Sequence, residues 1–338
     1  MFPLSPAEDR QRLPVAVLSG FLGSGKTTLL NRLLKDPRLA DTAVAINEFG
    51  EIPLDQHLID HGEDQTVVMA NGCLCCNVAG DMEDAVMRIF SRRESGAIPH
   101  FARLIVEPSG LADPAPIAQA ILRQPTLARV MRLESIVTVV DAAFGVRQLA
   151  EHPEARQQAA LADTIVVTKA DLADPAPVIA ALRERNGAAP IHQALHGAID
   201  PADLFTASFL DPAAPLSPIA EWVERHAPHS HSAATSISLV SDAPLSWPAF
   251  DRWLRQVRTG HADALLRVKG LLAIAGRPRP VVIQGVHHVL HPPAELADWP
   301  SADHRSRLVL ILRDPALAAE LRASWDRALP SLIDMVPA

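Results

Sequence analysis

Residues 20–27, Gly20-Phe21-Leu22-Gly23-Ser24-Gly25-Lys26-Thr27, decide the fold of this chain. They match the pattern G-x-x-x-x-G-K-[ST] at every fixed position. The apolar run Val15–Ser19 precedes them, and residues 28–34 have the pattern of a helix. Glycines let backbone N–H groups close around phosphate oxygens, and the helix N-terminus adds a favourable partial charge. The stretch predicts a phosphate-binding loop between a strand and a helix, with an ordinary glycine-rich turn as the alternative.

The side chains of this loop have distinct expected roles. Lys26 is expected to contact the β- and γ-phosphates, and the Thr27 hydroxyl is expected to bind Mg²⁺. The nucleotide-binding residues predicted in this segment are Gly20, Gly23, Ser24, Gly25, Lys26, Thr27 and Thr28.

A carboxylate follows another apolar run, Leu104–Glu107, and is followed by Pro108-Ser109-Gly110. A phosphate-binding loop needs a second partner for Mg²⁺ at the end of a neighbouring strand, and Glu107 fits that need or the placing of the attacking water. The Gly110 amide is expected to contact the γ-phosphate, since glycine allows close backbone approach. Lys26, Glu107 and Gly110 are therefore the catalytic candidates. Asp141 ends a further apolar run and is a weaker Mg²⁺ candidate or a helix cap.

The tetrapeptide Thr168-Lys169-Ala170-Asp171 follows the run Ile165–Val167 and is similar to the guanine motif N-K-x-D. An aspartate can accept hydrogen bonds from guanine N1 and N2, which adenine does not offer, so a site built on Asp171 favours GTP over ATP. Thr168, Lys169 and Asp171 are the predicted base-binding residues.

Composition limits the class of protein. The 338 residues carry a formal charge of −8, and 48% of them are apolar, which argues against global disorder. The acidic balance gives no indication of nucleic-acid binding. No apolar run reaches the length of a membrane span, and the N-terminus lacks the apolar core of a signal peptide. We therefore expect a cytoplasmic protein with no nucleic-acid or membrane partner.

Alternating strand-like and helix-like segments predict an α/β fold with a parallel sheet flanked by helices. The predicted strands of this part are Val15–Ser19, Ala43–Ile46, Val67–Met69, Leu104–Glu107, Ile136–Val140 and Ile165–Thr168, and a helix is expected over residues 82–92. We expect a P-loop domain over residues 1–210, a linker rich in proline and histidine over 211–235, and a smaller α+β domain over 236–338.

The last hundred residues group strands together with flanking helices. The predicted strands are Ser236–Val240, Leu265–Ile274, Pro280–Val289 and Arg307–Leu312, and the predicted helices are Trp247–Val257 and Ala316–Ala328. Strand alternation would put His287 and His288 on opposite faces, so no joint site is expected there.

All three cysteines lie within four positions, as Cys73, Cys75 and Cys76. They have no partners elsewhere for disulfides, and thiolates favour Zn²⁺ and similar ions. In an extended segment Cys73 and Cys75 point the same way, which leaves Cys76 as a third ligand or a packing residue. Such an incomplete ligand set suits a site that releases its metal. Buried small hydrophobes and a redox pair are the alternatives.

Other candidate ligands are weaker. Glu48 and Glu51 follow the second predicted strand and are candidate oxygen ligands or switch residues, with a solvated loop an equal alternative. Three linker histidines, His226, His229 and His231, could hold metal weakly, but a polar linker is the favoured interpretation.

The segments GFLGSGKTTLL, NEFGE, GCLCC, VEPSG, VVDA and TKAD occur here in one order, and LLRVKGLLAI, VVIQGVHHVLH and HRSRLVLI follow the linker. Over nearly the whole chain this resembles the CobW-type GTPases, relatives of the nickel-insertion GTPases of urease and hydrogenase maturation. The resemblance implies a GTP-dependent metallochaperone with Zn²⁺ or Co²⁺ on Cys73, Cys75 and Cys76. It further implies a GTP/GDP cycle with Mg²⁺ and a client, either a metalloprotein or a metal-cofactor biosynthesis enzyme. A homodimer is one candidate assembly.

The chain departs from the family pattern at Ile46, where some members carry a glutamate offered as a metal ligand, and in its short histidine content at the linker. Two other functions compete with this interpretation. A P-loop small-molecule kinase would need an acceptor pocket and an arginine-rich lid, and it would leave the cysteines unexplained. A non-catalytic metal or redox sensor would bind nucleotide without turnover.

Overall fold

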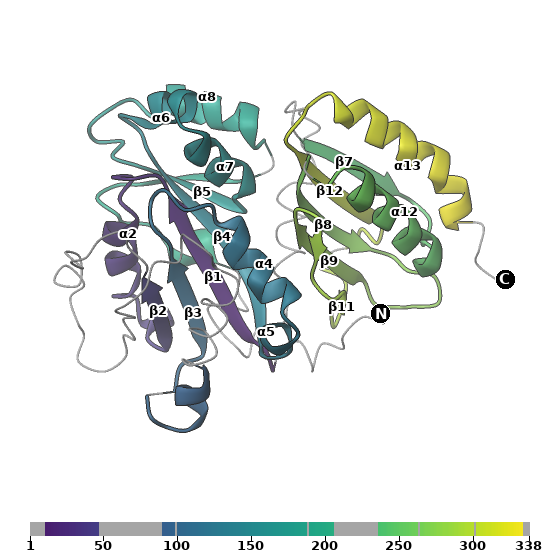
Figure 1. The fold of residues 1–338 in the computed structure, drawn as a ribbon, viewed down its shortest axis with the longest axis horizontal. Coiled ribbons are helices and arrows are strands. Elements are labelled where there is room, and N and C mark those ends of the chain that lie inside the picture. Colours follow the sequence, from purple (N-terminus) through teal and green to yellow (C-terminus); the bar gives the residue numbers. More distant parts are fainter. Residues whose placement is uncertain are drawn as a thin grey trace. The chain divides into compact units, whose positions relative to one another are not determined.

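The computed structural model describes residues 11–46, 90–98, 100–187, 189–205, 236–262, 264–300 and 302–333. The chain divides into two compact units (Figure 1). The P-loop unit comprises Arg12–Leu182 and Ala189–Ala214, and the C-terminal unit comprises Met1–Gln11, Arg183–Ala188 and Pro215–Ala338. Among the described residues, no helix combines the length and apolar character needed to cross a membrane.

A six-stranded parallel sheet in the order β2-β3-β1-β4-β5-β6 forms the centre of the described P-loop unit. Its strands are β1 (Leu13–Gly20), β2 (Thr42–Ile46), β3 (Arg103–Glu107), β4 (Met131–Asp141), β5 (Thr164–Thr168) and β6 (Ile191–Ala194). The α/β class predicted from the sequence is confirmed. Every residue of β1, β3, β4 and β5 is buried, which explains their nearly continuous apolar runs.

Helices cover both faces of this sheet. They are α2 (Lys26–Leu33), the 3₁₀ turn η1 (Pro37–Leu39), α4 (Ala115–Arg123), α5 (Pro125–Val130), α6 (Gly145–Glu151), α7 (Pro153–Leu161), α8 (Ala176–Arg185) and α9 (Pro201–Leu204). Strand β5 shows the two layers directly. Val166 belongs to the core that includes Leu29 of α2, whereas Val167 belongs to the core that includes Leu149 of α6 and Val178 of α8.

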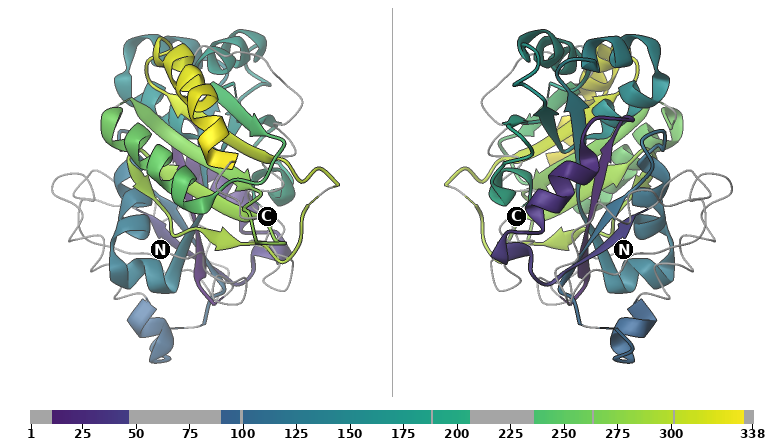
Figure 2. Two further views of the ribbon diagram at one scale, coloured as in Figure 1. Left: turned by 90° about the vertical axis from the view of Figure 1, so that its right-hand side faces the viewer. Right: turned by 90° about the vertical axis from the view of Figure 1, so that its left-hand side faces the viewer.

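The C-terminal unit is an antiparallel sheet in the order β10-β9-β8-β12-β7, with β11 paired to β9. Its strands are β7 (Ser236–Ser241), β8 (Leu265–Leu272), β9 (Val281–Val286), β10 (Val289–Leu290), β11 (Ala294–Glu295) and β12 (Ser306–Leu312). Helices α12 (Trp247–Gly260) and α13 (Leu317–Ile333) lie on one face of that sheet (Figure 2). Phe250, Trp253 and Trp325 pack there against Leu308 and Leu310 of β12.

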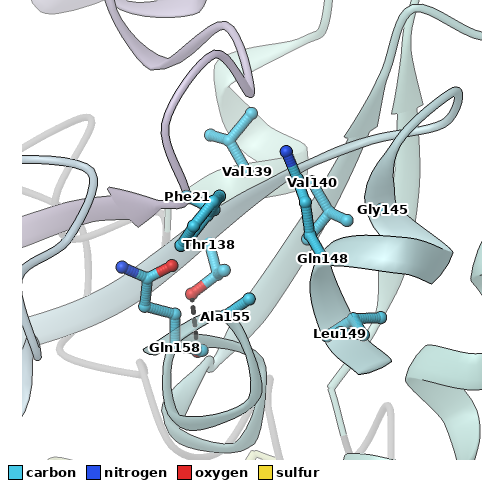
Figure 3. A pocket seen from close by; sticks show the side chains of 9 residues that line it. All are labelled: Phe21, Thr138, Val139, Val140, Gly145, Gln148, Leu149, Ala155 and Gln158. Atoms are coloured by element: carbon cyan, nitrogen blue, oxygen red, sulfur yellow. Dashed lines mark hydrogen bonds between the residues drawn. The ribbon is translucent and has the colours of Figure 1, made fainter. Parts of the chain in front are cut away.

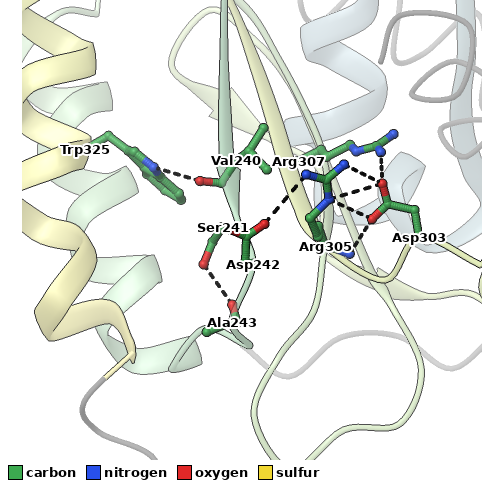
Figure 4. A network of polar contacts seen from close by, with 8 residues as sticks. All are labelled: Val240, Ser241, Asp242, Ala243, Asp303, Arg305, Arg307 and Trp325. Atoms are coloured by element: carbon green, nitrogen blue, oxygen red, sulfur yellow. Dashed lines mark hydrogen bonds and ion pairs between the residues drawn. The ribbon is translucent and has the colours of Figure 1, made fainter. Parts of the chain in front are cut away.

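A polar network lies at the start of β12 (Figure 4). Asp303 accepts hydrogen bonds from Arg305 Nε at 3.0 Å and from Arg307, and Arg305 also pairs with Asp242 at 3.6 Å. The hydrogen bonds from Arg305 hold the pKa of the Asp303 carboxyl well below its ordinary value. On the same sheet the Trp325 indole N–H donates to the Val240 carbonyl at 3.4 Å, which attaches α13 to β7.

Two sequence predictions need correction. The expected strand over residues 280–289 is interrupted at His287-His288, which connect β9 to β10 as a tight hairpin with His287 at φ 52°. The expectation that these two histidines lie on opposite faces of one strand is therefore wrong. Strand β4 also begins at Met131 rather than Ile136, and β6 was not predicted.

The predicted strand 67–69 lies outside the described residues, as does most of the predicted helix 82–92. Residues 90–94 are helical.

Candidate active site

The loop between β1 and α2 depends on glycine at both of its ends. A Cβ atom on Gly20 would lie 2.3 Å from the Val139 carbonyl oxygen of β4, so only glycine fits beside that strand. Gly25 adopts φ 93°, a left-handed conformation, immediately before α2 begins at Lys26. The loop therefore turns sharply and leaves the N-terminus of α2 pointing into it, the arrangement that binds phosphate elsewhere.

Lys26 and Thr27 open α2 and contact different parts of the site. Lys26 is 9% exposed, and its Nζ donates to the Gly20 carbonyl oxygen at 3.0 Å, across the loop. Thr27 Oγ1 donates to Glu107 Oε1 at 2.8 Å. Glu107 is buried at the end of β3, which pairs with β1 directly, so the strand order brings this carboxylate to the loop. A hydroxyl oxygen and a carboxylate oxygen thus lie side by side.

The segment after β3 packs on the loop. A Cβ atom on Gly110 would lie 2.7 Å from the backbone nitrogen and 2.8 Å from the Cα atom of Leu22, so the Gly110 backbone rests directly against the phosphate-binding loop. Gln158 of α7 contacts Gly110 from another side, through a hydrogen bond of 3.1 Å from Nε2 to the Gly110 carbonyl oxygen.

The predicted base motif is fastened to the same loop. Thr168 Oγ1 donates to the Ser24 carbonyl oxygen at 2.7 Å, and Lys169 Nζ donates to the Gly23 carbonyl oxygen at 2.7 Å. Lys169 has φ 57° and pairs through the same Nζ with Asp141 Oδ2 at 2.7 Å. These bonds join the ends of β4 and β5 to the loop that follows β1.

Asp141 lies in the turn ahead of α6, whose N-cap is Phe144, so the predicted role of a helix cap is not what the structure shows. Its Oδ1 accepts hydrogen bonds from the backbone N–H groups of Ala143 at 2.7 Å and Phe144 at 3.2 Å, ahead of α6. Its Oδ2 accepts from Lys169. The carboxylate therefore caps a turn and fixes Lys169, while Glu107 is the carboxylate in contact with Thr27.

Asp171 stands at the outer end of the base motif, with its side chain 31% exposed. His196 Nδ1 lies 3.7 Å from Asp171 Oδ2. His196 has φ 50° and belongs to the turn that follows β6, in which the Ala198 N–H donates to the Leu195 carbonyl oxygen. A turn after β6 thus borders the Asp171 carboxylate, which the sequence predicts as the acceptor for guanine.

Sequence reasoning missed three of these features: the contact of His196, the contact of Gln158 and the pairing of Asp141 with Lys169. His196 gave no signal because β6 was not predicted. Gln158 is a lone buried polar residue in the helix PEARQQAAL, and only its position among apolar neighbours distinguishes it. The pairing of Asp141 with Lys169 could have been found, since both residues end adjacent parallel strands.

The predicted metal ligands lie outside the described residues. They are Cys73, Cys75, Cys76, Glu48, Glu51, His226, His229 and His231. Within the described ranges, no group of three or more His, Cys, Asp or Glu side chains could hold a metal ion.

Two known protein families match most of this chain. Residues 14–194 match the family described as CobW/HypB/UreG, nucleotide-binding domain, and residues 234–329 match the cobalamin synthesis protein cobW C-terminal domain. The chain is 33% identical to the zinc chaperone YjiA of Escherichia coli over 93% of this chain and 98% of YjiA. It is 29% identical to the zinc chaperone CobW of Pseudomonas aeruginosa over 94% and 93% of the two chains.

A solved structure extends the likeness to the fold. The Zn(II)-bound YjiA GTPase of E. coli superposes with a TM-score of 0.67 at 28% identity, covering 94% of this chain and 99% of that one. The parallel sheet, the phosphate-binding loop and these relatives define a P-loop GTPase. Within that class, the chain belongs to the CobW/HypB/UreG family and carries the CobW C-terminal domain.

Proposed function

We propose that this GTPase binds Zn²⁺ or Co²⁺ at Cys73, Cys75 and Cys76 and delivers it to a client protein under control of the bound nucleotide. The observation that carries the nucleotide half of this proposal is the attachment of the base motif to the phosphate-binding loop by Thr168 and Lys169. A site joined in this way would hold both ends of one nucleotide. The zinc chaperones among the relatives support the metal half.

The contact between Thr27 and Glu107 supports Mg²⁺ as the cofactor of hydrolysis. Mg²⁺ prefers hard oxygen ligands, and a hydroxyl and a carboxylate lie here within 2.8 Å of each other. Bound Mg²⁺ would neutralise charge on the β- and γ-phosphates. Thr27 and Glu107 would hold it, directly or through water.

The remaining residues act on the nucleotide and the water. The backbone N–H groups of Gly23, Ser24 and Gly25 and the Lys26 ammonium would bind the phosphates, with Gly20 shaping the loop and Thr28 continuing α2. Glu107 would orient the attacking water, and the Gly110 N–H would donate to the γ-phosphate. Attack on the γ-phosphorus breaks its bond to the β–γ bridging oxygen and yields GDP and phosphate. We expect a slow intrinsic rate, since such GTPases often depend on a partner for speed.

Guanine selectivity is assigned to Asp171. Its carboxylate would accept from N1–H and the exocyclic amino group of guanine, and Lys169 would lie along the base. The substitution Asp171→Asn tests this, because an amide offers one acceptor and one donor. The variant should lose GTP affinity by at least tenfold and gain affinity for xanthosine triphosphate, which replaces the amino group by a carbonyl. Equal binding of GTP and ATP by the unmodified protein would contradict the assignment.

The proposal requires that the bound nucleotide changes the affinity of the cysteines for metal. Cysteine ligands bind metal as thiolates, so affinity should rise with pH through the thiol range. If nucleotide changes metal affinity, metal must change nucleotide affinity by the same factor. Glu48 is a further candidate ligand, and the linker histidines are not needed for the proposal.

Isothermal titration with Zn²⁺ and with Co²⁺ tests this claim in the presence of GDP and of a non-hydrolysable GTP analogue. We expect different metal affinities in the two nucleotide states, and loss of the site in the Cys75→Ser variant with GTP affinity retained in the absence of metal. Equal metal affinities in both states would overturn the coupling. Co-purification from zinc-starved cells would then identify the client, and the mass of the purified protein in solution would test the homodimer.

A further inference from the structure

Gln158 connects helix α7 to the segment that follows β3. Its side chain is 1% exposed, and Nε2 donates to the Gly110 carbonyl oxygen at 3.1 Å and to the Ala112 carbonyl oxygen at 2.9 Å. Only the amide nitrogen can bond to two carbonyl oxygens, so the orientation of the Gln158 amide is fixed by chemistry. The Gln158 side chain therefore donates to two residues, Gly110 and Ala112, that lie 48 and 46 positions earlier in the chain.

Gly110 is held on two sides by this arrangement. Gln158 bonds to its carbonyl oxygen, and the Leu22 backbone lies so close that even a methyl group on Gly110 would collide with it. Among the contacts of the described residues, Leu111 and Asp113 make no hydrogen bond to α7. Gly110 is therefore positioned against the phosphate-binding loop by contacts within the protein, with its carbonyl group fixed directly and its N–H one peptide group away.

Helix α7 is itself anchored to the sheet at the same residue. Thr138 Oγ1 of β4 donates to the Gln158 backbone carbonyl oxygen at 2.9 Å (Figure 3). Gln158 lines a small pocket with Thr138 and Phe21, whose ring stacks on His152 at a centroid distance of 4.6 Å. The bond from Thr138 involves the Gln158 main chain only, so it is separate from the two bonds that the Gln158 side chain makes to the segment after β3.

We propose that Gln158 is a positioning residue that holds the Gly110 N–H where a γ-phosphate needs it, and that it thereby sets the preference of the site for GTP over GDP. This inference rests on the proposed function, in which Gly110 contacts the γ-phosphate. Preorganised donors cost little reorganisation when the ligand binds, whereas a free segment must be ordered by the ligand itself. GDP has no γ-phosphate, so its affinity is independent of Gln158.

The test compares full-length wild-type protein with Gln158→Met and Gln158→Glu. Methionine keeps the length of the side chain and removes both donors, while glutamate as a carboxylate only accepts and faces two carbonyl oxygens. We expect Gln158→Met to lower the affinity for a non-hydrolysable GTP analogue by about tenfold, the equivalent of about 1.4 kcal/mol, with GDP affinity unchanged. Gln158→Glu should lose more. Single-turnover hydrolysis should slow by at least the same factor.

Thr138→Val is the matched control, since it removes a buried hydrogen bond to α7 and leaves both Nε2 donors in place. It should lower the melting temperature while the ratio of GTP-analogue to GDP affinity stays at the wild-type value. An unchanged ratio in Gln158→Met, or an equal loss of ratio in Thr138→Val, would overturn the inference. Failure of the wild-type protein to bind or hydrolyse GTP would instead overturn the proposed function, so the two failures are distinguishable.

Discussion

Lys169 of the predicted base motif makes two contacts within the protein itself. Its ammonium donates to the Gly23 carbonyl oxygen and pairs with Asp141, a carboxylate that is 1% exposed. The Lys169 side chain is 34% exposed, so solvent screens the pair in part. Lys169 therefore has a structural role in addition to its predicted contact with the base. Its backbone is left-handed, a strained conformation for a residue other than glycine.

A double-mutant cycle should measure this role. Lys169→Met is expected to lower the free energy of unfolding by about 1–3 kcal/mol, since it leaves a buried Asp141 carboxylate oxygen without its partner. Asp141→Asn is expected to cost less, since the partly exposed Lys169 ammonium keeps its bond to Gly23. Their combination should cost less than the sum, with a coupling energy of about 1–2 kcal/mol. Thermal unfolding without nucleotide is the measurement. Arg147→Met is the control, because Arg147 is 68% exposed and 4.0 Å from Glu151. A coupling near zero would show that Lys169 acts on nucleotide alone.

For single residues, the sequence predicted the residue types of the site better than it predicted the contacts that those residues make. The expected residues Thr27 and Glu107 lie together, because β3, which ends at Glu107, pairs directly with β1, which leads into the loop. The bond from Thr168 to Ser24 has no sequence signal, since it depends on the register between β4 and β5. The guanine motif N-K-x-D has asparagine at its first position, whereas Thr168 occupies that position here and donates its hydroxyl to the phosphate-binding loop.

Elements differ in how well their sequences predict them. Strand β5 is five buried residues in a row and was predicted nearly to its ends. Strand β6 was missed because three of its four residues, Ile191 to Gln193, are partly or fully exposed, so no apolar run marks it. The start of β4 was missed because Arg132 and Glu134 look polar, yet they are buried as an ion pair.

The turn η1 carries an acid-sensitive cap. Asp36 accepts hydrogen bonds from the backbone N–H and the guanidinium of Arg38, and the Arg38 side chain is the main cause that lowers the Asp36 pKa to about 2. A carboxyl with a lowered folded pKa stabilises the fold above its ordinary pKa of 3.8 and loses that contribution as pH falls towards about 2.

Melting temperatures measured from pH 6 to about pH 2 should therefore separate wild type from Asp36→Asn. We expect wild type to be the more stable protein at pH 6 and the difference to shrink as the pH falls from about 4 to about 2. A difference that stays constant over this range would show that Asp36 acts only through shape or its neutral hydrogen bonds.

The hairpin of β9 and β10 depends on Gly285. A Cβ atom there would lie 2.6 Å from the Val289 carbonyl oxygen, a backbone atom that cannot move aside alone. Gly285→Ala should lower the free energy of unfolding by about 1–3 kcal/mol. Gly260→Ala, at the end of α12 where nothing lies within 4 Å, is the matched control and should be neutral or stabilising by up to about 1 kcal/mol. Calorimetry compares the two, and equal effects would contradict the steric argument.

At the scale of the whole molecule, the two units have separate cores. The C-terminal core contains Phe250, Trp253 and Trp325, and the P-loop unit has its own clusters on the two faces of its sheet. The sequence predicts a division near Asp211 from the change in composition there, and the boundaries 210 and 235 stay predictions because the residues around them lie outside the described ranges.

Trp325→Ala should therefore act on one unit. Trp325 is 2% exposed and packs edge-on against Trp253 at 4.9 Å, so truncation should cost about 3–5 kcal/mol in the C-terminal unit. We expect GDP affinity to stay within about twofold of wild type, with Trp325→Phe as the milder control. Calorimetry and nucleotide titration check the two halves of this prediction. Loss of GDP binding in step with stability would show that the units unfold together.

The edge-on tryptophan pair of the C-terminal core has an optical consequence. Residues 1–210 contain no tryptophan, and the chain contains no tyrosine. The predicted P-loop domain therefore contributes no ultraviolet emission above 300 nm, and the four described tryptophans belong to the C-terminal unit. Any change in emission when GTP is added to the unlabelled protein would be a signal that the C-terminal half has registered the ligand of the other.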